Sequence, residues 1–146
     1  MEKEFVPYEL ASRMKQLEFD EPCFRYIYAG DTGNNVDIPC EVLPSKAENF
    51  NEDYLCISTP TCSQAFRWFR EKYHIIGEVK FKGGKTTQTA WYDYVIYSEI
   101  DWNDENPNEQ WKKHEEAELA CLKKLIEIVE KQKENDDMVS SDNVGY

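Results

Sequence analysis

Apolar residues recur at helical spacing near the start of the chain. Leu10, Met14 and Leu17 fall on one face of a helix. Pro7 suits the first turn, because proline lacks the N–H that would go unbonded there. The sequence therefore predicts a first helix over residues 7–18.

A start signal predicts a second helix in the middle of the chain. Thr61 is a helix-capping residue type, and Gln64 three positions later completes the pattern of a capping box. Apolar residues at helical spacing follow, with charged residues between them. The apolar set is Cys62, Phe66, Phe69 and Tyr73.

The third predicted helix, over about residues 109–133, has a wide apolar stripe. Its two adjacent apolar rows are broader than a coiled-coil seam. Residues 134–146 are polar, acidic and without periodicity, which predicts a disordered acidic tail. The two rows are Ala117, Cys121, Leu125 and Ile128, and Leu119, Leu122, Ile126 and Val129.

Period-two alternation predicts a first hairpin between the first two helices. Residues 23–29 and 36–42 alternate around a run of turn formers. Pro39 cannot donate to a strand ladder, so the second of these strands is expected at a sheet edge. Residues 44–54 are expected to form a polar loop.

A second hairpin is predicted around Gly83-Gly84, with Val79 and Phe81 before the turn and a return strand over 87–98. The predicted order is α-β-β-α-β-β-α. It describes an α+β fold in which three helices cover one antiparallel sheet of about four strands, formed by two hairpins. We expect one domain over residues 1–133.

Composition limits the class of protein. The chain has 146 residues, of which 40% are hydrophobic and 14% aromatic, enough to build the core of one domain. No apolar run approaches the roughly 20 residues of a spanning helix, and the first residues lack a basic segment followed by an apolar one. These features predict a cytoplasmic protein without a membrane segment.

Charge is distributed unevenly along the chain, whose net charge is −12. Residues 99–118 carry eight acids and two lysines, and residues 134–146 carry four acids and no base. Residues 67–85 carry six bases and two acids, a net of +4. The sequence is therefore bipolar, with one basic stretch in an acidic protein.

The five cysteines are widely and irregularly spaced, and the two histidines are far from any paired cysteines. This spacing favours buried, reduced thiols over a disulfide framework or a metal site. We expect no metal and no cofactor.

Three segments of the sequence resemble those of known proteins. They are Phe5-Val-Pro-Tyr-Glu-Leu-Ala11 with Phe19-Asp-Glu-Pro-Cys-Phe24, the segment Pro60–Tyr73, and the segment Glu115–Val129. Together they resemble a group of small proteins encoded by phages and prophage-like elements of Bacteroides-type gut bacteria. The resemblance implies a mobile-element origin and a bacterial cytoplasm, but no reaction. Members of the group carry Gly at the position of Glu18, which implies a left-handed cap or a different helix end here.

Catalytic chemistry has little support in the sequence. Cys62 and His74 are too far apart on one helix to form a nucleophile–base pair, and the carboxylates near residues 99–105 lie in a polar loop that would solvate them. An enzymatic role is therefore the third-ranked hypothesis.

Binding is the favoured class of function. The basic stretch with its aromatic residues fits a nucleic-acid surface, but the net charge repels a polyanion, so direct nucleic-acid binding is disfavoured. The first expectation is a non-enzymatic accessory or regulatory protein acting on a host or phage protein, or through self-association. The alternative is an acidic inhibitor that mimics nucleic acid. The candidate interaction residues are Arg67, Trp68, Arg70, Asp101, Trp102, Asp104 and Trp111.

Overall fold

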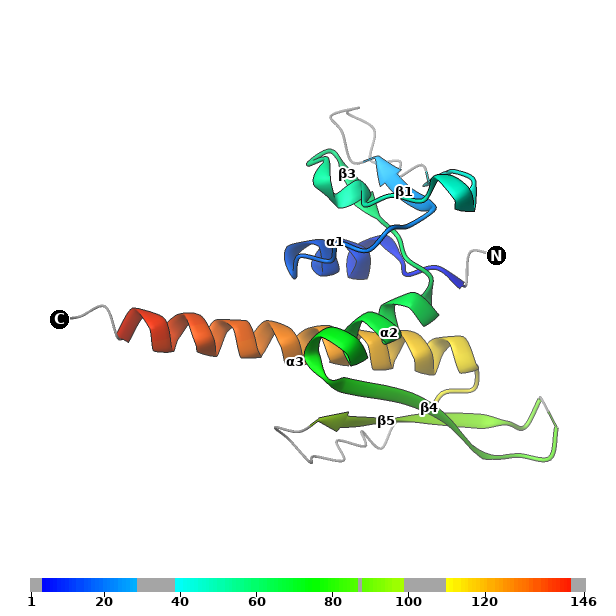
Figure 1. The fold of residues 1–146 in the computed structure, drawn as a ribbon. Coiled ribbons are helices and arrows are strands. Elements are labelled where there is room, and N and C mark those ends of the chain that lie inside the picture. The colour runs from blue at the N-terminus through cyan, green and yellow to red at the C-terminus, as the bar shows by residue number, and fades with distance from the viewer. Residues whose placement is uncertain (1–3, 29–38, 87, 99–109, 143–146) are drawn as a thin grey trace. The chain divides into compact units, whose positions relative to one another are not determined.

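The computed structural model describes residues 4–28, 39–86, 88–98 and 110–142, except for the side chains of 139–142. In chain order its elements are α1 (Tyr8–Gln16), β1 (Arg25–Tyr28), β2 (Pro39–Glu41), the 3-10 helices η2 (Pro44–Lys46) and η3 (Phe50–Glu52), β3 (Cys56–Ser58), α2 (Cys62–Tyr73), β4 (Ile75–Gly83), β5 (Trp91–Ser98) and α3 (His114–Asp142) (Figure 1).

The fold class is α+β with three α-helices, in agreement with the sequence, but the sheet differs. In the described residues the strands form two small antiparallel sheets, of order β2-β1-β3 and β4-β5, where the sequence predicts one sheet of four strands. The predicted order omits β3, because its three residues are all buried and show no alternation of apolar and polar positions.

Contacts within the chain divide it into two compact units, Met1–Ala65 and Phe66–Tyr146, and the boundary lies inside α2. The single domain over 1–133 stays a prediction. α3 continues to Asp142, so residues 134–142 are helical where the sequence predicts a disordered tail. A helix that is already nucleated gains one hydrogen bond for each residue it adds, which explains the extension into polar sequence.

In the first unit, α1 ends in a Schellman motif built on a non-glycine residue. The Phe19 N–H donates to the Met14 carbonyl at 3.1 Å, and the Glu18 N–H donates to the Lys15 carbonyl at 3.0 Å. Glu18 has φ 68, the left-handed conformation that such a cap requires. Phe19 and Met14 are both buried and supply the apolar contact of the motif. Of the two helix ends that the resemblance leaves open, the structure has the left-handed one.

The first unit's sheet has β1 at its centre. β1 pairs antiparallel with β2, where Ile27 is opposite Pro39, and with β3, where Ile27 is opposite Ile57. β2 lies at the edge, as predicted from Pro39.

Polar side chains fix the loop between β2 and β3. Asn51 donates from Nδ2 to the Phe19 carbonyl at 3.0 Å, and its Oδ1 accepts from the Ser58 N–H at 2.8 Å. Lys15 donates from Nζ to the carbonyls of Asp53 and Cys56 at 2.9 and 2.6 Å. These bonds hold the loop to the end of α1 and to β3, and no pattern in the sequence predicts them.

The predicted cap of α2 is confirmed in one of its two bonds. Thr61 Oγ1 accepts from the Gln64 N–H at 3.1 Å. The Gln64 side chain does not complete the predicted capping box, because its Nε2 donates to the Pro22 carbonyl at 2.8 Å and to Glu21 Oε2 at 3.3 Å. Gln64 thus ties the start of α2 to the segment before β1.

In the second unit, β4 and β5 form the hairpin predicted around Gly83-Gly84. The strands pair from Ile75 opposite Ser98 to Gly83 opposite Trp91, with a bulge between Phe81 and Gly83. The connection is longer than a tight two-residue turn. Gly84, at its start, has a positive φ of 103°.

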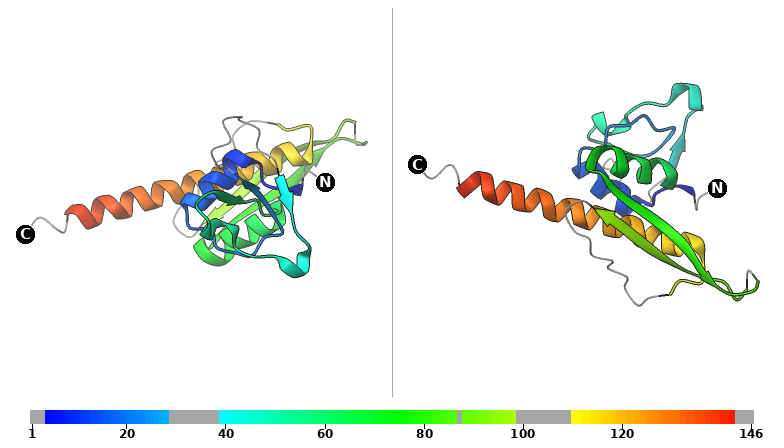
Figure 2. Two further views of the ribbon diagram at one scale, coloured as in Figure 1. Left: turned by 90° about the horizontal axis from the view of Figure 1, so that it is seen from above. Right: turned by 60° about the horizontal axis from the view of Figure 1, so that its bottom comes forward.

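Gly77 allows β4 to approach α3 closely. A Cβ at this position would lie 2.8 Å from Cys121 Sγ, 2.9 Å from Phe66 Cε1 and 3.1 Å from Leu125 Cδ1. α3 packs against both strands of the hairpin (Figures 1 and 2). Six of the eight predicted apolar positions of α3 are fully buried, and Leu119 and Ile128 are half-buried.

We predict that Glu18→Gly raises the free energy of unfolding by about 1 kcal/mol, because glycine avoids the cost of a left-handed non-glycine residue. Gln16→Gly, two residues earlier and inside α1, should lower it by about 0.5–1 kcal/mol. Glu18→Ala keeps the strain and should change little. Urea denaturation of the three variants measures these differences. Equal effects of glycine at positions 16 and 18 would contradict the assignment of strain to Glu18.

We predict that Gly77→Ala lowers the free energy of unfolding by about 1–3 kcal/mol through overpacking against α2 and α3. Cys121→Ala removes the sulfur nearest to the new methyl group. Cys121→Ala should therefore destabilise the Gly77→Ala protein less than it destabilises the wild type. A double-mutant cycle measured by urea denaturation gives this difference. Independent, additive effects would contradict contact between these two positions.

Candidate interaction surface

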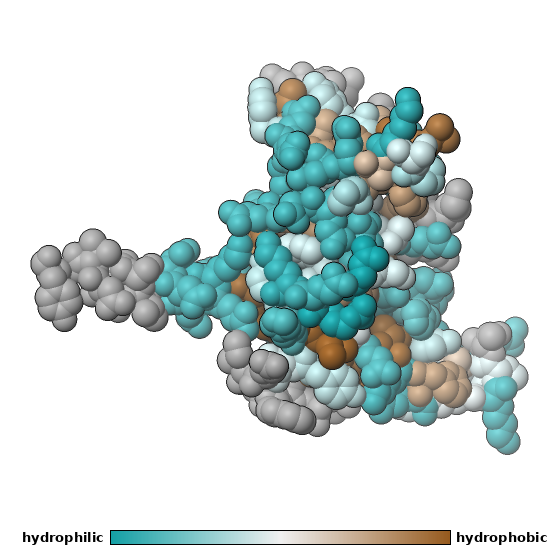
Figure 3. Space-filling model, in the orientation of Figure 1, coloured by the Kyte–Doolittle hydropathy of each residue, from teal (hydrophilic) through white to brown (hydrophobic). Residues whose placement is uncertain are grey.

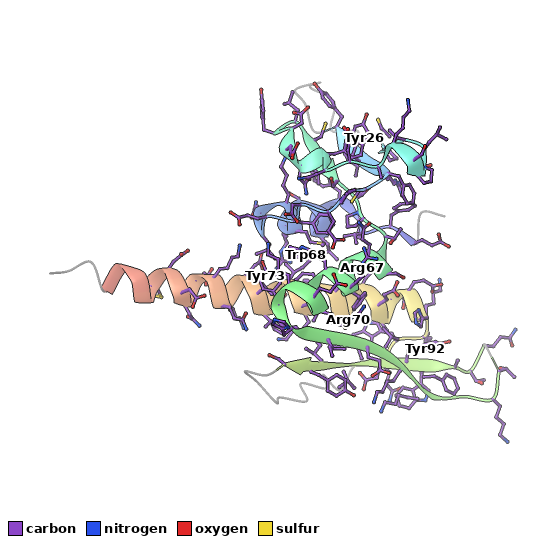
Figure 4. All side chains as sticks on the ribbon, viewed as in Figure 1. Tyr26, Arg67, Trp68, Arg70, Tyr73 and Tyr92 are labelled. Carbon is purple, nitrogen blue, oxygen red and sulfur yellow. The ribbon has the colours of Figure 1, made fainter. Side chains whose placement is uncertain are left out.

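The residues predicted on α2 divide between the surface and the interior. Figure 4 shows Arg67, Trp68 and Arg70 projecting from this helix. Arg67 and Arg70 are exposed, but Trp68 is only 3% exposed. Its ring meets those of Phe69 and Tyr73 edge-on, at centroid distances of 5.0 and 5.3 Å. The prediction of Trp68 as an exposed contact residue is therefore wrong, because its indole belongs to an aromatic cluster.

Trp111 has a structural role that the sequence does not reveal. It forms an isolated antiparallel bridge with Tyr92, with N–H to carbonyl distances of 2.8 and 3.1 Å. Its half-buried ring lies 5.3 Å from that of Tyr94. Asp101, Trp102 and Asp104 lie outside the described residues.

Exposed apolar side chains occur on both faces of the β4–β5 hairpin. Ile76 is 43% exposed and lies opposite Tyr97, which is 39% exposed. Phe81 is 60% exposed, and its ring meets that of Tyr92 edge-on at 6.0 Å. Apolar atoms are visible at the surface along this hairpin among hydrophilic ones (Figure 3). Other exposed large apolar residues, such as Leu43 and Tyr54, lie in the first unit.

The same hairpin carries positive charge. Residues 79–92 contain three lysines and no acidic residue, and of these Lys82 and Lys85 are exposed. We call the set Ile76, Phe81, Lys82, Lys85 and Tyr97 the hairpin surface. The sequence analysis selects tryptophans rather than Phe81 as contact residues, because strand alternation assigns Phe81 to the apolar side of β4.

No thiol for which the structure gives a pKa shift is activated. Burial raises the pKa of Cys23 and of Cys121 to about 12, and burial also raises the pKa of Cys56. A hydrogen bond with Cys40 raises the pKa of Tyr26, which removes another candidate nucleophile. None of the five cysteines forms a disulfide. A nucleophilic thiolate needs the opposite shift, a lowered pKa.

The described part of the chain has neither a metal cluster nor a membrane span. It contains no group of three or more His, Cys, Asp or Glu side chains placed to hold a metal ion. Within the same residues, no helix is both long and apolar enough to cross a bilayer.

We predict that Cys40, the one half-buried cysteine, reacts first with iodoacetamide at pH 8 in the native protein. With a pKa of about 12, only about one in ten thousand Cys23 or Cys121 thiols is ionised at that pH. Peptide mass spectrometry over time identifies the labelled residue, and Cys40→Ala should abolish the fast phase. Labelling of Cys121 as fast as Cys40 would contradict the burial of Cys121.

Comparison with known proteins adds no assignment to this surface. No family model, no curated protein and no solved structure matches the chain.

Proposed function

We propose that the protein is a non-enzymatic accessory or regulatory protein that acts by protein–protein contact, with the hairpin surface as its contact site. In keeping with the sequence resemblance, we place it in a phage or prophage, acting in the bacterial cytoplasm on a host or phage protein.

The observation that carries this proposal is the exposure of Phe81 in β4, followed along the chain by the exposed Lys82 and Lys85. Burying a phenylalanine side chain is worth about 1.5–3 kcal/mol, so a partner that covers Phe81 gains a substantial contact. An aromatic anchor with a polar rim is the usual composition of an interface. The lysines favour a partner whose surface is acidic.

The thiols also support a non-enzymatic role. Burial raises the pKa of Cys23, Cys56 and Cys121, so these residues are held in their unreactive form.

The alternative, an acidic mimic of nucleic acid, needs a regular array of one sign. On the described part of α3 and the residues before it, exposed Glu115 and Glu116 follow exposed Lys112 and Lys113, and Lys123 is exposed further along the helix. This mixture of signs favours the contact proposal over the mimic.

We predict that a protein retained by the immobilised wild type from a lysate of a Bacteroides-type bacterium is lost with the Phe81→Ser variant. Loss is expected because serine removes the apolar anchor while leaving the exposed strand position polar and unstrained. Quantitative mass spectrometry of the eluates gives the ratio, which should fall about tenfold or more, since a single hot-spot residue is worth about 2 kcal/mol or more.

The matched control is Leu43→Ser, which removes a side chain that is 67% exposed in the first unit. It should retain the same protein at the wild-type level. Retention that is unchanged by Phe81→Ser, or reduced equally by both substitutions, would overturn the hairpin surface as the contact site.

A further inference from the structure

We infer that the partner contributes an extended, acidic segment that pairs as a third strand with the outer edge of β4. This inference rests on the proposed function and specifies how the contact is made. Addition of a strand to an open sheet edge is a recurrent mode of peptide recognition, in which main-chain bonds give affinity and alternate side chains give specificity.

The hydrogen bonds of Tyr92 reveal which groups of β4 point to the open edge. Tyr92 uses both its N–H and its carbonyl on Trp111, on the side of β5 away from β4. Phe81, opposite Tyr92, is therefore in a non-hydrogen-bonded pair, and its own N–H and carbonyl point away from β5. Because strand residues alternate, Val79 points the same way, while the main-chain groups of Glu78 and Lys80 face Val95 and Asp93 of β5. The Glu78 main chain also forms a hydrogen bond with the Cys121 thiol.

This edge is open among the residues that the structure describes. In these residues β4 pairs with β5 alone. Residues 78–82 are half-buried or exposed throughout. α3 and α2 cover the face of the sheet at Gly77, through Cys121, Leu125 and Phe66, rather than its edge beyond Gly77.

Charge selects the occupant. Lys82 is exposed near the end of β4 and Lys85 is exposed in the connection after it, while the exposed Glu78 is the one acidic residue of the strand. Lysine on an edge strand disfavours pairing with a like strand, because the same positive charges would meet. A second copy of the chain brings the same lysines, whereas a segment with acidic side chains gains attraction at each of them.

Amide hydrogen exchange of the ¹⁵N-labelled full chain, measured by NMR, tests the inference. In the free protein, the amides of Val79 and Phe81 should exchange at least about tenfold faster than those of Glu78 and Lys80, which face β5. The probe is a capped peptide of about eight residues with alternating Glu and Val, at millimolar concentration. It should slow exchange at Val79 and Phe81 about fivefold, while the matching peptide of alternating Lys and Val should not.

Two variants separate backbone pairing from charge. Val79→Pro removes an N–H that points outward and should therefore abolish protection by the acidic peptide. The hairpin itself should tolerate the proline, because no ladder bond to β5 is lost. Slow exchange at Glu78 and Lys80 would show that its hairpin is intact. Lys82→Glu combined with Lys85→Glu leaves the backbone unchanged and should transfer protection to the lysine peptide.

Three results would overturn the inference: fast exchange at Val79 and Phe81 that the acidic peptide leaves unchanged, equal protection by both peptides, or protection that rises with protein concentration alone. The last would identify a second copy as the occupant. If these results are found while capture still depends on Phe81, the partner binds the faces of the hairpin and the proposed function stands. If capture does not depend on Phe81, the proposed function fails independently of the exchange data.

Discussion

The close approach of β4 to α3 at Gly77 is the constraint on which the second unit depends. A strand can lie this near a helix only where no side chain separates them, and a Cβ added to Gly77 would meet Cys121 Sγ at 2.8 Å. Cys121 is completely buried at this contact, and burial raises the pKa of its thiol. The contact lies in the first half of β4, whereas Phe81 in the second half is exposed.

The first unit depends on bonds of a different kind. Its strands are short, with four, three and three residues, and such strands provide few ladder bonds. Side chains supply what the ladder lacks: Asn51 bonds both to the end of α1 and to β3, and the left-handed Glu18 turns the chain so that Phe19 packs beside Met14. A strained residue is tolerated here because the bonds on both sides of it over-determine its conformation.

Sequence patterns predict the features of this molecule that follow from periodic spacing or residue type. They miss features that depend on one particular contact in the folded chain. The apolar rows of α3 and the cap at Thr61 follow from periodicity and residue type, and both are present. β3 has no alternation to detect, and the second bond of Gln64 goes to Pro22, which is close only in the folded chain. Trp68 looks like a contact residue because it lies off the apolar rows, yet the neighbouring rings of Phe69 and Tyr73 enclose it. The candidate surface therefore moves from α2 to Phe81, which is exposed although it lies on the apolar side of β4.

The net charge of −12 does not prevent the hairpin from attracting an acidic segment. At physiological ionic strength the Debye length is about 8 Å, so charges farther away than this contribute little at the point of contact. A short acidic strand beside β4 therefore responds mainly to Lys82 and Lys85. A long polyanion extends over many Debye lengths and also meets the acidic parts of the chain, where each contact is repulsive. Screening thus makes the proposed contact with a short acidic segment compatible with the net negative charge of the chain.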